Sequence, residues 1–171
     1  MNNYEYIVAS LPDITPGWKF GEKTPDDYIE EIVGLCSEKD RKTIAFLMDG
    51  YQDEKLSAEF YTAALQHSDR FIREYFLFDL NVRNAKVRFL NKALGRYADK
   101  DVLAFAEEAA PAVLDAVEAE FEEAADIETI LNSGHILSRE RGMDDLMWEK
   151  IDNLTTFNYF DIDAILGFIT K

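Results

Sequence analysis

The sequence predicts an all-α fold, a bundle of several helices around one long central helix over about residues 69–96. Three observations lead to this prediction. Apolar residues recur at helical spacing through most of the chain, N-capping residues precede several of these stretches, and the central stretch has no Pro and has Gly only near its end. A length of 171 residues with 47% hydrophobic content suits one domain, or two small ones, with a substantial core, and we predict a single helical domain over residues 1–171.

The N-terminal part has one ambiguous segment and one aromatic loop. Residues 4–11 are aromatic and β-branched and end at Pro12, which favours either a short extended segment or a first helical turn against the core. The following loop carries Trp18 and Phe20 beside a Pro-Gly pair. We expect these two rings to anchor the loop on the bundle or to contact a partner.

Three shorter helices precede the central one, and each has a recognisable N-cap. Thr24 is followed by Pro and two acids, a pattern that satisfies the first amides of a helix. Ser37 repeats the pattern for a second helix, which should end at Gly50. Ser57 caps a third helix that runs to about Leu65. Short connections of this kind favour antiparallel packing.

The central helix carries two apolar stripes, so we expect burial on most of its sides. We expect it to fray or bend at Gly95. The first stripe is Phe71, Tyr75, Phe78, Val82, Ala85 and Phe89, and the second is Phe76, Leu80, Val87, Leu90, Leu94 and Tyr97.

Polar residues interrupt this apolar surface in its middle, at Asp79, Arg83, Asn84 and Arg88. Asp79 stands four residues before Arg83, the favourable order for an ion pair on a helix. In an apolar environment such charges need partners, so a structural ion pair with capping amides is the first interpretation. A ligand or phosphate site on Arg83 and Arg88 and a partner-facing site are the alternatives.

Beyond residue 100 the helix signals are more mixed. Pro111 should kink a helix or begin one, and an amphipathic helix is predicted over 112–125, with a further short helix capped by Asp126. Residues 138–145 are highly charged around Gly142, which predicts a loop or a frayed helix start. Two more helices follow, the last over 161–171. Because the sequence stops within this apolar helix, we expect the native chain to be longer.

Charge is distributed unevenly along a chain whose formal net charge is −16. Residues 101–138 hold ten acids and no Lys or Arg, whereas residues 70–100 hold eight bases and three acids. Such an acidic balance argues against nucleic acid as a partner. The acidic helical subregion over 101–138 is either a solvated face or a surface for a basic partner.

No apolar run approaches the length of a membrane-spanning helix, and the N-terminus lacks the pattern of a secretory signal. The single cysteine, Cys36, lies on an apolar helical face and is expected to be a core residue. These features predict a cytoplasmic protein.

Sequence motifs for catalysis are lacking. Neither His67 nor His135 has a Glu three residues before it, as a di-iron site requires, and no phosphate-binding or dinucleotide motif occurs. We therefore predict no catalytic residue, no metal ligand and no cofactor. A helical enzyme using unmarked carboxylates, such as Glu107-Glu108 or the acids of 118–123, is the less favoured alternative.

Three stretches resemble a known group of proteins. Residues 75–88, YFLFDLNVRNAKVR, resemble the acid-x-x-x-basic-Asn helix repeated in the C-type subunit of V-type ATP synthases, whose eukaryotic counterpart is the d-type subunit of V-ATPases. The opening YEYIVASLP (4–12) and the closing WEKIDNLTTFNYFDID (148–163) resemble an uncharacterised bacterial family encoded among V-type ATPase genes. This chain has one clear copy of the motif helix where the C-type subunit has several.

The resemblance implies an all-helical, non-catalytic component that links the central stalk of a rotary ATPase to its membrane ring. Its partners would be other ATPase subunits, and it would lie in the cytoplasm, peripheral to the inner face of the plasma membrane. Trp18, Trp148 and Tyr159 are the candidate partner contacts. The alternative from charge is an acidic adaptor that binds a basic protein.

Overall fold

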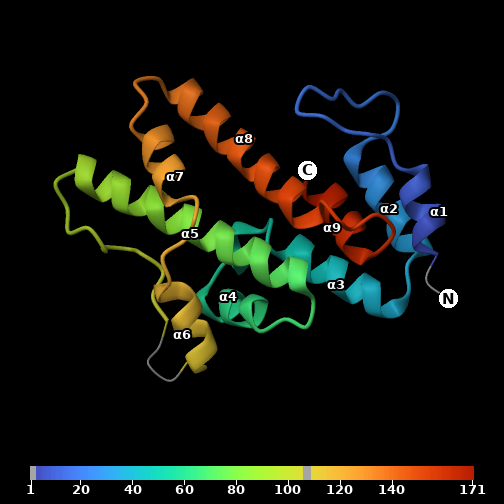
Figure 1. The fold of residues 1–171 in the computed structure, drawn as a ribbon, viewed down its shortest axis with the longest axis horizontal. Coiled ribbons are helices and arrows are strands. Elements are labelled where there is room, and N and C mark those ends of the chain that lie inside the picture. The colour runs from blue at the N-terminus through green and yellow to red at the C-terminus, as the bar shows by residue number, and fades with distance from the viewer. Residues whose placement is uncertain (1–2, 106–108) are drawn as a thin grey trace. The chain divides into compact units, whose positions relative to one another are not determined.

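The computed structural model describes residues 3–105 and 109–171, and within those ranges the chain forms helices and no strand (Figure 1). The predicted all-α fold class is therefore confirmed. Contacts divide the chain into two compact units. Unit 1 comprises the residues up to Asp53 together with Met147–Lys171, and unit 2 comprises Glu54–Leu146. The single domain over 1–171 stays a prediction, and Glu107-Glu108 lie outside the described residues.

Unit 1 has a core of aliphatic side chains. Its helices are α1 (Tyr4–Ser10), α2 (Pro25–Leu35), α3 (Glu38–Asp49), α9 (Ile162–Thr170) and the C-terminal part of α8 (Ile136–Thr155). Helix α1 packs against α9, and α3 packs against both α2 and α9. The core side chains that are at most 2% exposed are Ile7, Ile32, Ile44, Leu47, Ile165 and Leu166.

The N-caps predicted for unit 1 are present. The side chain of Thr24 accepts a hydrogen bond from the backbone of Asp27 at 3.3 Å, and Asp27 accepts one in return from the backbone of Thr24 at 2.7 Å. Ser37 caps α3 through the backbone N–H of Asp40 at 3.2 Å. Each cap satisfies an amide that has no partner inside its own helix, so these boundaries follow from local sequence.

The N-terminal segment is the helix α1, so the extended alternative for this segment is wrong. Ile7 is 1% exposed, and the hydroxyl of Tyr4 donates to the Asp40 carboxylate at 2.9 Å. Residues three apart lie on one face of a helix, whereas in a strand they point to opposite faces. Only the helix lets Tyr4 and Ile7 both turn inward.

Unit 2 is organised on α5 (Arg70–Ala93). After a short 3-10 helix, η1 (Asp53–Lys55), helix α4 (Ala58–Leu65) packs on α5, as do α6 (Pro111–Glu118) and α7 (Ala124–Leu131). Aromatic rings fill the α4–α5 interface, where Phe60 and Phe76 meet edge to face at 5.0 Å between centroids. Helix α5 ends at Ala93, and Gly95 adopts φ +64°, a conformation that favours glycine.

The expected burial of α5 on most sides is correct for its first half only. Phe71, Phe76 and Leu80 are at most 1% exposed. Further along the second stripe, Leu90 and Leu94 are 56% and 59% exposed. Tyr97, which lies beyond the helix end, is 75% exposed. The apolar pattern continues along α5, but no neighbouring helix among the described residues covers this end of the stripe.

The predicted helix over 112–125 is interrupted. Helix α6 begins at Pro111, as one of the two alternatives stated, but ends at Glu118, and α7 begins only at Ala124. Ala119 between them is extended, with ψ 142°. A straight helix over 111–131 would be about 31 Å long. The break lets two shorter helices pack on α5 instead, and the apolar spacing gives no sign of it.

The predicted loop or frayed start over 138–145 is wrong, because α8 runs unbroken through these residues. Gly142 marks a close approach of helices and not a turn. A Cβ atom on it would lie 2.9 Å from Cγ2 of Ile130. The charges nearby are compatible with the helix, since Arg141 pairs with Asp145 one turn later at 3.0 Å.

Two predictions from composition agree with the structure. Cys36 is a buried free cysteine, 6% exposed. Among the residues that the structure describes, no helix combines the length and the apolar character needed to cross a bilayer.

Candidate interaction surfaces

Asp79 on α5 is engaged by α4. Its carboxylate accepts a hydrogen bond from the hydroxyl of Tyr61 at 2.6 Å, and Tyr61 is completely buried. Burial raises the pKa of Asp79, while the Tyr61 hydrogen bond and the charge of Arg83 act in the opposite direction. Burial and the neighbouring Asp79 charge raise the pKa of Tyr61 well above its usual value. The sequence did not identify Tyr61 as this partner.

Arg83 influences Asp79 through its charge, and the direct ion pair between them stays a prediction. Nε of Arg83 is buried and has no hydrogen-bond partner among the described residues. The side chains of this polar layer therefore serve the α4–α5 contact.

Two further residues of the predicted polar motif, Asn84 and Arg88, bind the segment that follows α5. Asn84 accepts a hydrogen bond from the backbone N–H of Leu103 at 3.2 Å, and Nε of Arg88 pairs with Asp99 at 2.8 Å. Asn91, which the sequence reasoning missed, donates to the carbonyls of Ala98 at 2.9 Å and Lys100 at 2.6 Å. Asn84, Arg88 and Asn91 recur at i, i+4 and i+7, a spacing that could have identified them as one face.

The loop between α8 and α9 exposes three aromatic side chains. Tyr159, a predicted partner contact, is 68% exposed, and its neighbours Phe157 and Phe160 are 86% and 55% exposed. The loop is also fixed in place. The side chain of Asn158 donates to Asp161 at 2.5 Å, and Asp161 caps α9 through the backbone N–H of Ala164 at 3.0 Å. The three rings therefore stand on a locally ordered turn.

Trp148 and Trp18, the other predicted contacts, are less open. Trp148 is half-buried, and Nζ of Lys171 lies 5.0 Å from the centre of its ring. The same ammonium group also forms an ion pair with Asp152. Trp18 is 40% exposed in the loop before α2. Among the described residues, no ring contact joins Trp18, Trp148 and Tyr159, so the three do not form one cluster.

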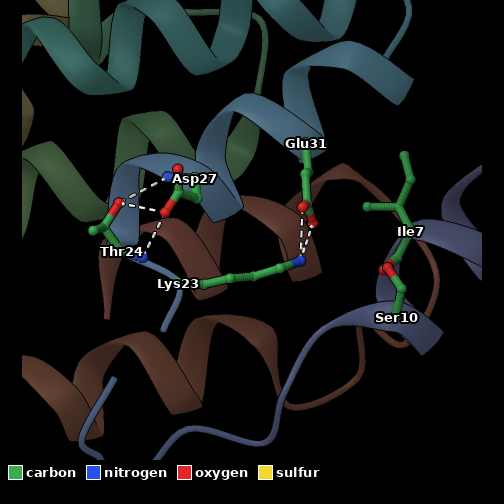
Figure 2. Close-up of polar contacts among 6 residues, drawn as sticks. All are labelled: Ile7, Ser10, Lys23, Thr24, Asp27 and Glu31. Atoms are coloured by element: carbon green, nitrogen blue, oxygen red, sulfur yellow. Dashed lines mark hydrogen bonds and ion pairs between the residues drawn. The ribbon is translucent and has the colours of Figure 1, made fainter. Parts of the chain in front are cut away.

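Unit 1 also has an apolar groove of about 360 Å³ between α1 and α2. The one charged residue in its described lining, Glu31, is paired, as Figure 2 shows: Nζ of Lys23 reaches the carboxylate of Glu31 at 2.6 and 2.8 Å. The hydroxyl of Ser10 donates to the carbonyl of Ile7 at 2.7 Å. The residues that line the groove are Tyr6, Ile7, Ser10, Leu11, Tyr28, Glu31, Ile32, Gly34 and Leu35.

This groove is suited to contact and not to chemistry. Tyr6 and Leu35 at its rim are 60% and 46% exposed. Lys23 neutralises the charge of Glu31, and the pKa of Lys23 is raised chiefly by this hydrogen bond. Apolar side chains therefore dominate what the groove offers to a partner.

Cys36 is buried and His67 is half-buried. Burial raises the pKa of the Cys36 thiol, which disfavours the nucleophilic thiolate. Nδ1 of His67 accepts a hydrogen bond from the backbone of Asp69 at 3.0 Å, and burial lowers the pKa of His67. Within residues 3–105 and 109–171, no group of three or more His, Cys, Asp or Glu residues could hold a metal ion.

Comparison with known proteins gives one match. The model of a family described as "Protein of unknown function (DUF2764)" matches residues 49–171, so the chain belongs to that family. Neither the curated proteins nor the solved structures gave a match.

Proposed function

We propose that this member of the DUF2764 family is a non-catalytic structural and coupling component of a V-type rotary ATPase, with a role similar to that of the C-type subunit. The resemblance of residues 4–12, 75–88 and 148–163 to proteins of that assembly supports the proposal. In this role the protein binds other ATPase subunits of the stalk or membrane ring. It works in the cytoplasm, at the inner face of the plasma membrane, and catalyses no reaction.

The observation that carries the proposal is the ordered aromatic turn formed by Phe157, Tyr159 and Phe160, with exposures of 86%, 68% and 55%. Large rings concentrated in four residues are typical of the anchors that dominate binding at protein interfaces. Because Asn158 and Asp161 already fix this turn, binding requires little further ordering of its backbone.

The α1–α2 groove supplies a second apolar surface in the same unit. Its charged group is neutralised internally, so an apolar partner segment meets no unpaired charge among the described residues there. By contrast, the predicted motif residues Asp79, Asn84 and Arg88 contact their own chain. We therefore assign those residues to fold integrity, and the partner contacts to unit 1.

The test is recovery of partners at native expression level. The chromosomal copy is tagged, and ATPase subunits that co-purify with it are identified. We expect stalk or ring subunits with the natural sequence, and about tenfold less of them after Phe157→Ser, Tyr159→Ser and Phe160→Ser together. The matched control is Tyr97→Ser, which removes an aromatic ring that is 75% exposed in unit 2.

Recovery of no ATPase subunit while the ATPase itself remains intact would contradict the proposed function. If subunits are recovered equally with and without the three aromatic rings, the assembly stands and the assignment of the contact to this turn is wrong. Circular dichroism must show that each variant keeps the helix content of the natural sequence, so that a loss of recovered subunits reflects lost binding and not unfolding.

An acidic adaptor is the second candidate, because one observation favours it. Six exposed carboxylates lie on α6, on α7 and in the segment between them, and no Lys or Arg occurs in this stretch of sequence. They are Asp115, Glu118, Glu120, Glu122, Asp126 and Glu128. Binding of a basic protein there should weaken steeply as salt is raised, whereas binding through the aromatic turn should respond little. A salt titration of the purified complex therefore separates the two candidates.

A further inference from the structure

Unit 2 contains a groove of about 480 Å³ between α5 and α7. On α5 the lining positions are 85, 88, 89 and 92, followed by Arg96 just past its end, and on α7 they are 124, 127, 128 and 131. Both sets follow the i, i+3, i+4, i+7 spacing of one helix face. From position 85 to 92 the α5 wall extends about 10 Å, or two helical turns. One face of each of the two helices therefore borders the groove.

The floor of this groove is apolar. Ile127 and Leu131 are 1% and 8% exposed, so they form its base, and Phe89 and Phe121 are partly covered. The ring of Phe89 is covered by Arg139 at 5.5 Å. Ala85, Ala98 and Ala124 also line the groove, and their small side chains leave room above the floor.

Bases line one side of the groove. Arg88, Lys92 and Arg96 belong to the α5 side, and the single acid in the described lining, Glu128, stands on α7. Arg88 is paired with Asp99, but Lys92 and Arg96 form no ion pair within the described part of the chain. Residues 83–100 hold six bases and one acid in a protein of net charge −16. The α5 side of this groove is thus locally basic on an acidic protein, while Glu128 makes the α7 side acidic.

We propose that the α5–α7 groove binds an acidic amphipathic helix through about two of its turns. The apolar face of that helix lies on Phe89 and Phe121, which are only partly covered, and its carboxylates lie beside Lys92 and Arg96. A groove lined by one face of each of two helices suits a helical partner better than a compact ligand. The bases of the α5 wall select an acidic partner over a basic one. The proposal does not depend on which assembly the protein joins, so it goes beyond the proposed function.

The experiment uses two synthetic peptides of about 14 residues that share one leucine pattern, at i, i+3, i+4 and i+7. One carries glutamate on its flanks and the other lysine, and each is labelled for fluorescence anisotropy with the full-length protein. The glutamate peptide should bind at least about tenfold more tightly than the lysine peptide. Its binding should weaken when salt rises from about 50 mM to about 500 mM.

Two variants locate the binding. Lys92→Glu with Arg96→Glu should weaken the glutamate peptide by at least about tenfold and should create binding of the lysine peptide. The matched control is Lys39→Glu with Lys42→Glu, which makes the same change of charge on two exposed residues of α3. Because all four residues are exposed, the helix content and melting temperature should stay close to those of the natural sequence.

Two results would overturn the proposal. The first is equal binding of both peptides, or binding that the groove variant and the control variant change equally. The second is binding of sodium laurate, a carboxylate with an apolar tail, with no binding of either peptide. That result would show that the groove takes a small amphiphile.

Discussion

The two halves of α5 have the same apolar periodicity and opposite environments. In the first half, Phe71, Phe76 and Leu80 are at most 1% exposed, and α4 supplies aromatic partners. In the second half and at its C-cap, Leu90 and Leu94 are more than half exposed, and Arg88 and Lys92 line a groove. The comparison teaches that a continuous apolar stripe indicates which residues of a helix can be buried. Which of those residues are buried depends on where neighbouring helices pack.

The largest expected effect comes from Phe76→Ala in the first half. Phe76 is 1% exposed and lies 5.0 Å from Phe60 and 5.2 Å from Tyr75, measured between ring centroids. Removing its ring leaves a cavity in this interface, which should lower the free energy of unfolding by about 3–5 kcal/mol. Urea unfolding followed by circular dichroism measures the change. A loss below about 1 kcal/mol would show that this half is not the core of unit 2.

Asn91→Ala tests how the second half is held. Asn91 is 3% exposed, and its amide satisfies the carbonyls of Ala98 and Lys100. Losing these bonds should cost about 1–3 kcal/mol. Hydrogen exchange should also rise at the backbone N–H of Leu103, because the segment 98–103 is then held by fewer bonds. Unchanged hydrogen exchange at Leu103 would mean that Asn84 and Arg88 hold this segment in place without Asn91.

Asp79→Asn should change the pH dependence of stability at the junction of the two halves. Asp79 titrates near 3.8 when unfolded, and burial raises its pKa in the folded protein. Between these two pKa values the folded state binds more protons, so the free energy of unfolding falls as pH rises. The variant lacks this fall and can still accept the Tyr61 hydrogen bond.

Urea unfolding of both proteins from about pH 4 to about pH 8 measures this difference. Natural-sequence stability minus variant stability should decrease as pH rises through the folded-state pKa of Asp79 and then level off. Two parallel curves would contradict a raised pKa. A difference that grew with pH would point instead to a carboxylate stabilised by Arg83.

Leu94→Ala should have the smallest effect. Leu94 belongs to the same stripe as Phe76 but is 59% exposed, so its substitution should change the free energy of unfolding by no more than about 0.5 kcal/mol. The same urea titration serves as the measurement. A loss of more than about 2 kcal/mol would show that this end of the stripe is covered in the folded protein, and the contrast between the halves would disappear.

The parts of the fold that could be predicted are those set by neighbours in sequence. Thr24, Ser37 and Ser57 each cap the helix expected after them, because a cap needs only a side chain and an amide three residues on. Gly142 was misleading because the reason for it lies on another helix, at Ile130. The break after Glu118 was missed for a similar reason, since amphipathic spacing continues across it.

The candidate surfaces were predicted in part. Tyr159 was expected to be a contact, but Phe157 and Phe160 were overlooked, although the three rings occur within four residues of sequence. The ion pair expected between Asp79 and Arg83 stays a prediction, and the hydrogen-bond donor to Asp79, Tyr61, comes from α4 and could not be inferred from i, i+4 spacing. The α5–α7 groove had no sequence signature, because its two walls lie far apart along the chain.

The sequence alone determined the helical class of this protein, most of its caps and the separation of acidic from basic segments, because each depends on residues a few positions apart. Only the tertiary structure decided which apolar residues became core, which became the walls of grooves and which stayed in solvent. The reason is that burial needs a partner surface, and the position of that surface depends on contacts between residues distant in sequence.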